Sequence, residues 1–289
     1  MFTRACALLC ALTWCLHAHR ASAAEAPGHA GGKEPENVEI ESELYIGRHG
    51  YWHGGLGAVV ALGEDLHLGL GAHAQREVLG ATEVSYFNAE LIRDFADDLE
   101  VEIFGFVYPE VERLQAVGTG LRGTWKVLQR EDESLSLFCG PSYARARSVV
   151  EETDELETMH HLMLLGGITW EIGDVAVTLI GSHSFYNRDP EGVETHVGLT
   201  DMTHFAAYEN NDGFVRDTAA VEVAWEMNAW LTLNLRYAAM WFESETRHAF
   251  AITPGVKVSG RVELETGVEF LRGGESENDL VFVGLSMVF

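Results

Sequence analysis

The stretch that decides the fold is Asp279–Phe289, which reads DLVFVGLSMVF. Every second residue counted back from Phe289 to Val281 is apolar, whereas the other set contains Ser286 and Gly284. Alternation with a period of two and one apolar face is typical of a β-strand, because successive side chains point to opposite faces of a sheet. The stretch therefore predicts a terminal strand that is paired with a neighbour. The last strand of a soluble β-sandwich would also fit, so the rest of the chain has to decide.

This ending also resembles the C-terminal assembly signal of bacterial outer-membrane β-barrels. In that signal the barrel assembly machinery recognises a terminal aromatic residue, an apolar residue two positions before it and an upstream glycine. Phe289, Met287 and Gly284 stand at those positions, although an aromatic residue is more usual at the place of Met287. The resemblance implies a barrel in the outer membrane of a Gram-negative bacterium. It also implies contact with that machinery and with outer-membrane lipids such as lipopolysaccharide.

The N-terminal residues predict an export signal over residues 1–23. Arg4 supplies positive charge, a short apolar run follows, and the small residues 21–23 offer a cleavage site. Residues 24–37 are polar and contain several small residues, which predicts a disordered periplasmic lead-in. The remaining residues, 38–289, are enough for one large domain, and we expect them to form the barrel.

Composition restricts the class of protein. Apolar residues make up 47% of the chain, yet the part after the export signal has no unbroken apolar run of about 18 residues, the length that a membrane helix needs. The net charge of −26 argues against nucleic acid as a partner and suits a protein that binds or passes cations. Only Cys139 remains after the export signal, so no internal disulfide is expected.

Strand-like runs repeat along the rest of the chain, separated by polar breaks. Leu66–Gln75 is the clearest, because leucine and alanine occupy one set of alternate positions while histidine, glycine and glutamine occupy the other. Leu231–Trp241 and Val262–Phe270 show the same pattern. Ala81–Ile92 alternates poorly, which predicts a β-bulge there.

The breaks are alternately short, such as Gly173-Asp174, and longer, such as 187–212. This organisation is typical of an up-and-down antiparallel barrel with short turns on the periplasmic side. We therefore predict an all-β transmembrane barrel of about fourteen strands, an even number as in other bacterial barrels. Twelve strands would result if Val38–Ile46 were not a strand.

Aromatic residues favour the membrane barrel over the soluble sandwich. One group lies near the short breaks: Trp125, Trp170, Trp225 and Trp230. A second group lies near the longer breaks: Trp52, Phe106, Tyr108, Tyr143, Phe185, Tyr186, Trp241 and Phe250. Two such groups predict the two aromatic girdles that mark the membrane interfaces.

The register opposite to the apolar one should line the lumen of the barrel. The charged residues expected there are Glu39, Glu41, Glu43, Glu100, Glu102, Arg122, Lys126, Glu222, Glu226, Arg236, Lys257, Arg261, Glu263, Glu265 and Glu269. The glutamates of the thirteenth strand would share a wall with those of the first, whereas Arg122 and Lys126 would lie about half a turn away around the barrel.

The acidic excess predicts a porin-like channel for passive diffusion of ions and small polar solutes, with a preference for cations. A closed barrel whose interior charges pair with one another is the alternative. The 187–212 loop would narrow the channel if it folded inward, or remain on the surface.

Several histidines fall in or beside the expected outer loops, among them His53, His160 and His248, together with carboxylates. Imidazole and carboxylate groups can bind transition metals. Their spacing matches no known ligand motif, so we interpret them as scattered surface residues and expect no metal site and no cofactor. Divalent cations that bridge outer-loop carboxylates to lipopolysaccharide phosphates are an intermediate case.

An outer-membrane lipid hydrolase is the third alternative. Such enzymes carry a His-x-Ser pair, whose spacing puts both side chains on one face of a strand. Here His183 has Phe185 in the place of that serine, and the adjacent Ser182 and Ser184 face the other way. We therefore expect no enzyme activity.

Overall fold

The computed structural model describes residues 38–47, 51–63, 65–76, 83–95, 98–111, 114–150, 155–188, 193–194, 215–242, 245–273 and 278–289. The expected export signal, the lead-in over 24–37 and most of the 187–212 loop lie outside the described residues. Within the described ranges, no helix has the length and apolar character needed to cross a membrane.

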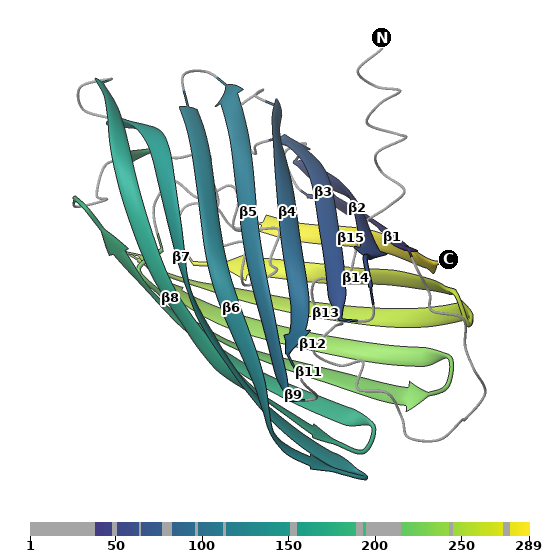
Figure 1. Ribbon diagram of the computed structural model, residues 1–289. Coiled ribbons are helices and arrows are strands. Elements are labelled where there is room, and N and C mark those ends of the chain that lie inside the picture. The colour runs from purple at the N-terminus through teal and green to yellow at the C-terminus, as the bar shows by residue number, and fades with distance from the viewer. Residues whose placement is uncertain are drawn as a thin grey trace.

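The described chain forms one antiparallel sheet (Figure 1). Its strands are β1 (Val38–Ile46), β2 (Trp52–Ala61), β3 (Leu66–Arg76), β4 (Glu83–Phe95), β5 (Leu99–Val111), β6 (Leu114–Arg130), β7 (Glu133–Val150), β8 (Glu155–Ile172), β9 (Val175–Tyr186), β10 (Val193–Glu194), β11 (Asp217–Asn228), β12 (Leu231–Trp241), β13 (Thr246–Ser259), β14 (Val262–Arg272) and β15 (Asn278–Val288).

Pairing between the first and last strands closes the sheet into a barrel. Glu39 lies opposite Val288, and Glu43 lies opposite Gly284. Every other wall strand pairs with its neighbours in chain order, with β9 followed directly by β11, while the two-residue β10 pairs only with the end of β7. Fourteen of the fifteen described strands therefore form the wall, which confirms the up-and-down barrel. The twelve-strand count is wrong, because Val38–Ile46 is a strand.

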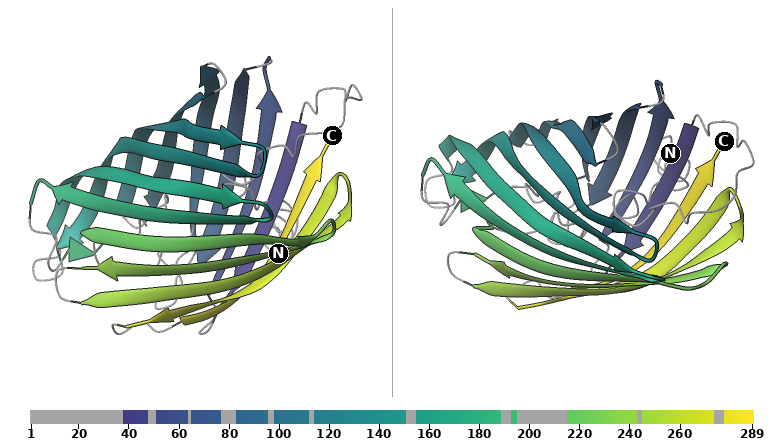
Figure 2. Two further views of the ribbon diagram at one scale, coloured as in Figure 1. Left: turned by 90° about the horizontal axis from the view of Figure 1, so that it is seen from below. Right: turned by 60° about the horizontal axis from the view of Figure 1, so that its bottom comes forward.

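Figure 2 shows the wall from two further directions, with the purple-to-teal strands facing the green-to-yellow strands across the interior. Tight turns join the strands at one end, such as Gly173-Asp174 between β8 and β9. Gly173 has a φ of 54°, a left-handed conformation that glycine adopts without cost in tight hairpins. The bulge expected within 81–92 is wrong for the described part of that range, since β4 pairs with β3 and β5 without a register shift.

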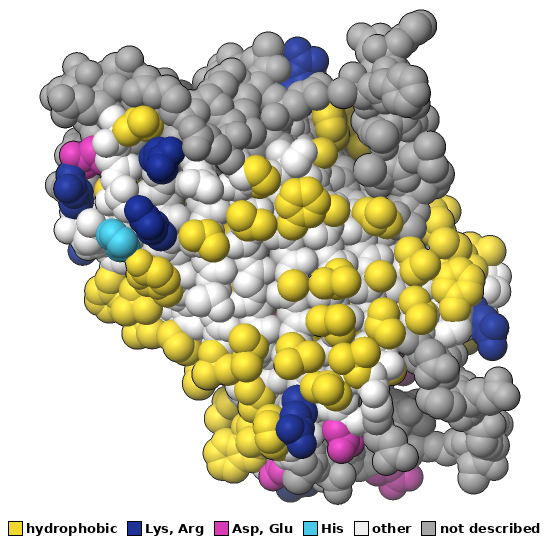
Figure 3. Space-filling view, turned by 45° about the horizontal axis from the view of Figure 1, so that its top comes forward, with side chains coloured by type: hydrophobic (Ala, Val, Ile, Leu, Met, Phe, Trp, Pro, Cys, Tyr) yellow, Lys and Arg dark blue, Asp and Glu magenta, His cyan; other side chains and the backbone are white. Residues whose placement is uncertain are grey.

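The outer surface carries the apolar belt that a lipid-facing barrel needs (Figure 3). The exposed fraction is 56% for Val281 and 47% for Val283 on β15, and 58% for Phe289 directly after it. These are members of the apolar set that alternates in the terminal stretch. The four tryptophans near the short turns are also exposed: Trp125, Trp170, Trp225 and Trp230.

The girdle expected near the longer loops needs a correction. Tyr143, Phe185, Trp241 and Phe250 are exposed as expected. In contrast, Tyr108 is buried in an interior cluster, and two more members of the expected girdle, Phe106 and Tyr186, pack against that cluster. The reason is strand alternation: Val107 and Phe185 face outward, so the residues beside them face inward.

Glycines on the inner wall make room for large rings from neighbouring strands. Phe104 lies across from Gly120, and Phe106 lies across from Gly118. A methyl group added at either glycine would overlap the facing ring. The same relation joins Phe282 to Gly267. These rings therefore lie against the wall, each covering a backbone segment without a side chain.

Candidate functional site in the barrel interior

One wall of the interior, made of β14, β15 and β1, is acidic. Glu263 and Glu41 both lie opposite Ser286 on the intervening strand, while Glu265 and Glu43 both lie opposite Gly284. The members of each glutamate pair are therefore level and two strands apart, about 10 Å at the usual strand spacing. Neither β1 nor β15 contains lysine or arginine, and β14 contains only Arg272 at its end.

These acidic side chains are enclosed. The exposed fraction is 2% for Glu41, 8% for Glu43, 9% for Glu265 and 3% for Glu269. Of the other glutamates expected on the inner face, Glu102 is buried, Glu39, Glu100, Glu222 and Glu263 are partly buried, and Glu226 is exposed. Buried or partly buried glutamates that alternate with outward-facing apolar residues are side chains that face the interior of the barrel. That these groups line a pore remains a prediction.

Three of the basic residues expected in the lumen pair with a glutamate, Arg122 and Arg236 with one on an adjacent strand and Lys257 with one two strands away. Arg122 forms an ion pair with Glu102. Arg236 Nε lies 3.5 Å from Glu222 Oε1, and the Lys257 ammonium lies 3.6 Å from a Glu226 carboxylate oxygen.

The charges of Arg122, Arg236 and Lys257 are therefore balanced locally by carboxylates. Lys126 is exposed near the short-turn end of β6. Arg261 lies in the exposed turn between β13 and β14 rather than on a strand.

A row of rings runs around the inner wall across six adjacent strands at the long-loop end. We call it the interior belt: Phe282, Tyr45, His53, His73, Tyr86, Tyr108 and Phe106. Its closest contact is the stack of His73 on Tyr86, with ring centroids 3.9 Å apart and an angle of 9°. Tyr86 stacks on Tyr108 in turn, at 4.5 Å.

Two members of the interior belt, Phe106 and Tyr108, are expected from the sequence in the outer girdle, and His53 is expected on the surface; all three face the interior instead. The available signal was strand alternation, because His53, His73 and Tyr45 share the register of the inward glutamates. The belt shows that the interior at this end is not simply charged.

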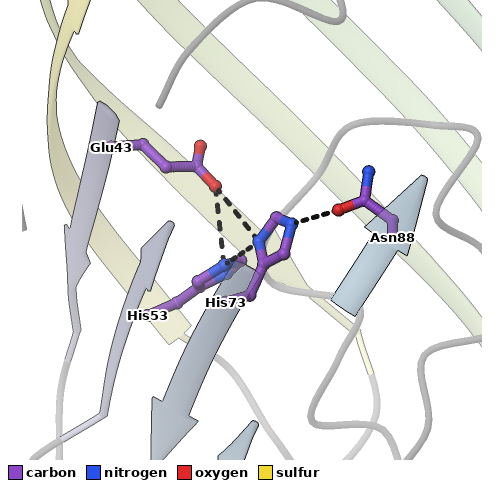
Figure 4. Close-up of polar contacts among 4 residues, drawn as sticks. All are labelled: Glu43, His53, His73 and Asn88. Atoms are coloured by element: carbon purple, nitrogen blue, oxygen red, sulfur yellow. Dashed lines mark hydrogen bonds and ion pairs between the residues drawn. The ribbon is translucent and has the colours of Figure 1, made fainter. Parts of the chain in front are cut away.

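Two imidazoles of the interior belt converge with a neighbouring carboxylate (Figure 4). Glu43, His53 and His73 come from β1, β2 and β3, and each is buried. His53 Nε2 lies 3.2 Å from His73 Nδ1, and Glu43 Oε1 lies 3.5 Å from His53 Nε2 and 4.0 Å from His73 Nδ1. Asn88 Oδ1 on β4 lies 3.2 Å from the other ring nitrogen of His73. We refer to the first three residues as the Glu–His–His cluster.

The candidate hydrolase residues His183, Ser182 and Ser184 do not form a pair of nucleophile and general base. His183 Nδ1 lies 2.6 Å from Asp217 Oδ1, and its ring meets the edge of Phe185. Ser184 is buried on the opposite face. This arrangement provides an imidazole held by a carboxylate but places neither adjacent serine beside it.

Comparison with protein-family models gave no match, and comparison with curated proteins gave none either. Solved structures share the fold. The CymD monoaromatic hydrocarbon channel is 10% identical, with a TM-score of 0.55 over 88% of both chains. OccAB1 of Acinetobacter baumannii is 9% identical, with a TM-score of 0.52 over 88% of this chain and 74% of that one. OccK8 (OprE) of Pseudomonas aeruginosa is 10% identical, with a TM-score of 0.50 over 88% and 77%.

At such low identity the similarity concerns the fold alone. The chain is a closed, fourteen-stranded antiparallel barrel with the architecture of outer-membrane channels. The apolar outer belt and the architecture agree with the location expected from the terminal stretch, the outer membrane of a Gram-negative bacterium.

Proposed function

We propose that the protein is an outer-membrane channel for passive diffusion of small cations. The observation that carries the proposal is the acidic wall of β14, β15 and β1, where level glutamates face the interior and no lysine or arginine intervenes between them. A field of one sign in a confined passage concentrates ions of the opposite sign. The basic residues Arg122, Arg236 and Lys257 each have a carboxylate partner, which limits their attraction for anions.

The dimensions of the interior favour small solutes. Fourteen strands lie between the roughly eight strands of barrels that side chains fill and the roughly 16–18 strands of water-filled porins. Tyr86, Tyr108 and Met159 are each at most 2% exposed although their strands line the barrel. Side chains therefore occupy much of the interior at the long-loop end, and we expect the conducting path to admit hydrated ions rather than sugars.

Ion selectivity in planar bilayers tests the proposal. A variant with Glu263, Glu265 and Glu269 changed to glutamine keeps the side-chain shape but removes three charges from the acidic wall. We expect its reversal potential in a salt gradient to shift toward zero or to the anion side, because the field that favours cations is weakened.

Glu226→Gln is the matched control for this experiment. Glu226 is 53% exposed in its side chain and lies beside Lys257 at the short-turn end, so its removal should change selectivity little. An unchanged reversal potential in the triple variant would contradict the role of the acidic wall.

A closed barrel with a structural or surface-binding role is the second candidate. The buried interior belt and the local ion pairs favour it, since they are the contacts of a filled interior. The same bilayer measurement separates the two candidates. Discrete current steps support the channel, whereas their absence at all voltages in correctly folded protein supports the closed barrel.

We assign no enzyme activity, because His183 has Asp217 and Phe185 as neighbours rather than a serine.

Outer-membrane lipids remain the proposed surroundings. On the outer face near the long loops, Arg145 on β7 lies opposite His160 on β8, and Arg147 follows two residues later on the same face. His160 Nδ1 lies 2.5 Å from the hydroxyl of the exposed Tyr143. Cationic side chains at this level suit the phosphates of lipopolysaccharide, and we propose this rim as a contact surface for them.

A further inference from the structure

We propose that the Glu–His–His cluster is a binding site for one divalent transition-metal cation of the zinc class. The site is built into the wall of the barrel and uses Glu43, His53 and His73 as ligands. It does not depend on conduction, since a metal can bind to the wall of an open or a closed barrel.

The distances between the three donor atoms fit a single ion. For a tetrahedral zinc bound at about 2.0–2.1 Å, neighbouring ligand atoms lie about 3.3 Å apart. The distances observed between the donor atoms are 3.2, 3.5 and 4.0 Å. Two imidazoles and one carboxylate form a donor set that zinc and related divalent metals use, with a further position left for water.

The register of the first three strands produces this convergence. Glu43 and His73 are both opposite Gly55 on the intervening strand. Because Gly55 has no side chain, Glu43 and His73 can lean toward each other above it. His53, two residues before Gly55 on β2, then reaches the same point from the long-loop side. The ring of His73 is held in place by its stack on Tyr86.

Asn88 determines which ring nitrogen of neutral His73 carries the proton. Its side-chain oxygen can only accept a hydrogen bond, so the 3.2 Å contact requires the proton of neutral His73 to sit on Nε2. The lone pair of His73 Nδ1 then faces His53 and Glu43. In the absence of metal, a single proton on His53 Nε2 would serve both His73 Nδ1 and the Glu43 carboxylate. When a cation binds, the His53 proton moves to Nδ1 of the same ring or is released, so that Glu43 Oε1, His73 Nδ1 and His53 Nε2 can all act as ligands. Asn88 is then the outer partner that orients a metal-binding imidazole.

Burial of the cluster makes the binding of a cation more favourable at this point. The exposed fractions of Glu43, His53 and His73 are 8%, 3% and 5%. A carboxylate removed from water is costly unless a positive group compensates it. A divalent cation bound by the three donor atoms supplies that positive charge.

The experiment is zinc titration of the purified barrel in detergent after treatment with a chelator, followed by calorimetry. Cobalt serves as a second probe, because its visible absorption reports nitrogen and oxygen coordination. We expect saturable binding of one ion per chain. Changing His73 to alanine should weaken binding by about 100-fold or more, since loss of a ligand exceeds the roughly 10–100-fold effect of losing an outer partner. Glu43→Gln, which keeps the side-chain size, should also weaken binding and change the cobalt spectrum.

The matched control is His67→Ala. His67 lies on the same inward register of β3, but six residues from His73, about 20 Å at 3.4 Å per residue. The His67→Ala variant should bind zinc with the affinity of the native chain. Asn88→Ala should weaken binding and Asn88→Asp should restore it, an effect that loss of packing alone would not produce.

Faster migration in unheated detergent gels identifies variants that have folded into a barrel. If the native barrel binds no zinc, the proposal is overturned. Native affinity in folded Glu43→Gln and His73→Ala would overturn it as well. A current in bilayers has no bearing on either outcome, so failure of this site and failure of the proposed channel are distinguishable.

Discussion

The two ends of the barrel interior are built from different chemistry. At the long-loop end, the interior belt packs ring against ring, and Tyr86 is only 1% exposed. At the short-turn end, Lys257 and Glu226 form an ion pair whose side chains are 38% and 53% exposed. Stacked rings exclude water and hold a fixed shape, whereas exposed ion pairs move and are screened. For the proposed channel, this difference predicts that the narrowest part of the passage lies at the long-loop end and a wider entrance at the short-turn end.

The largest effect is expected from Tyr86→Ala. Removing a fully buried aromatic side chain typically costs about 3–5 kcal/mol of stability, and here it would also open the belt next to His73 and Tyr108. We expect a lower unfolding midpoint in denaturant and a several-fold larger single-channel conductance. Tyr143→Ala is the control, because Tyr143 faces outward and is 44% exposed. Equal conductance in the native chain and the Tyr86 variant would place the constriction elsewhere.

An intermediate effect is expected from the pair of Glu102 and Arg122. The side chain of Glu102 is 6% exposed and that of Arg122 is 26% exposed. Glu102→Gln leaves a partly buried guanidinium without its carboxylate partner, which should cost about 1–3 kcal/mol. Changing Arg122 to glutamine in the same chain should recover part of this loss in a denaturant titration. A double variant less stable than Glu102→Gln would show that the pair is not the source of the effect.

The smallest effect is expected from Lys257→Met. The pair with Glu226 is exposed on both sides, and such pairs typically contribute less than about 1 kcal/mol. The midpoint of unfolding should therefore stay close to that of the native chain, and it should respond little to added salt. A loss as large as that of Glu102→Gln would show that the short-turn end is more enclosed than the comparison implies.

Strand pattern predicted most of the fold. Alternation in Asp279–Phe289 assigned the outward face of β15, and the alternation of short and longer breaks gave the number of wall strands. Both depend on local chemistry, since side-chain direction repeats every two residues and turns have a distinctive composition. The expected bulge before Ile92 failed because poor alternation in β4 comes from inward-facing apolar residues, not from a shifted register.

The interior was harder to predict because its contacts cross strands. Phe106 and Tyr108 lie near a long loop, as a girdle requires, but their register turns them inward. Similarly, Glu43, His53 and His73 are ten and twenty residues apart along the chain, so no sequence motif joins them. Only the register of β1, β2 and β3 brings them together above Gly55. Pairs such as Glu102 and Arg122 depend on the same information.

The pairing of β1 with β15 also has a consequence for how the protein is made. The Ser42 hydroxyl donates to the carbonyl of Leu285 across a sequence separation of 243 residues. Until the last strand arrives, the growing sheet therefore keeps two open edges with unpaired amides, which can recruit strands from other chains. Closure is a late and long-range event, because loop entropy opposes contacts between distant segments. A barrel that has not yet closed should therefore aggregate more readily than the closed barrel, whatever the stability of its single hairpins.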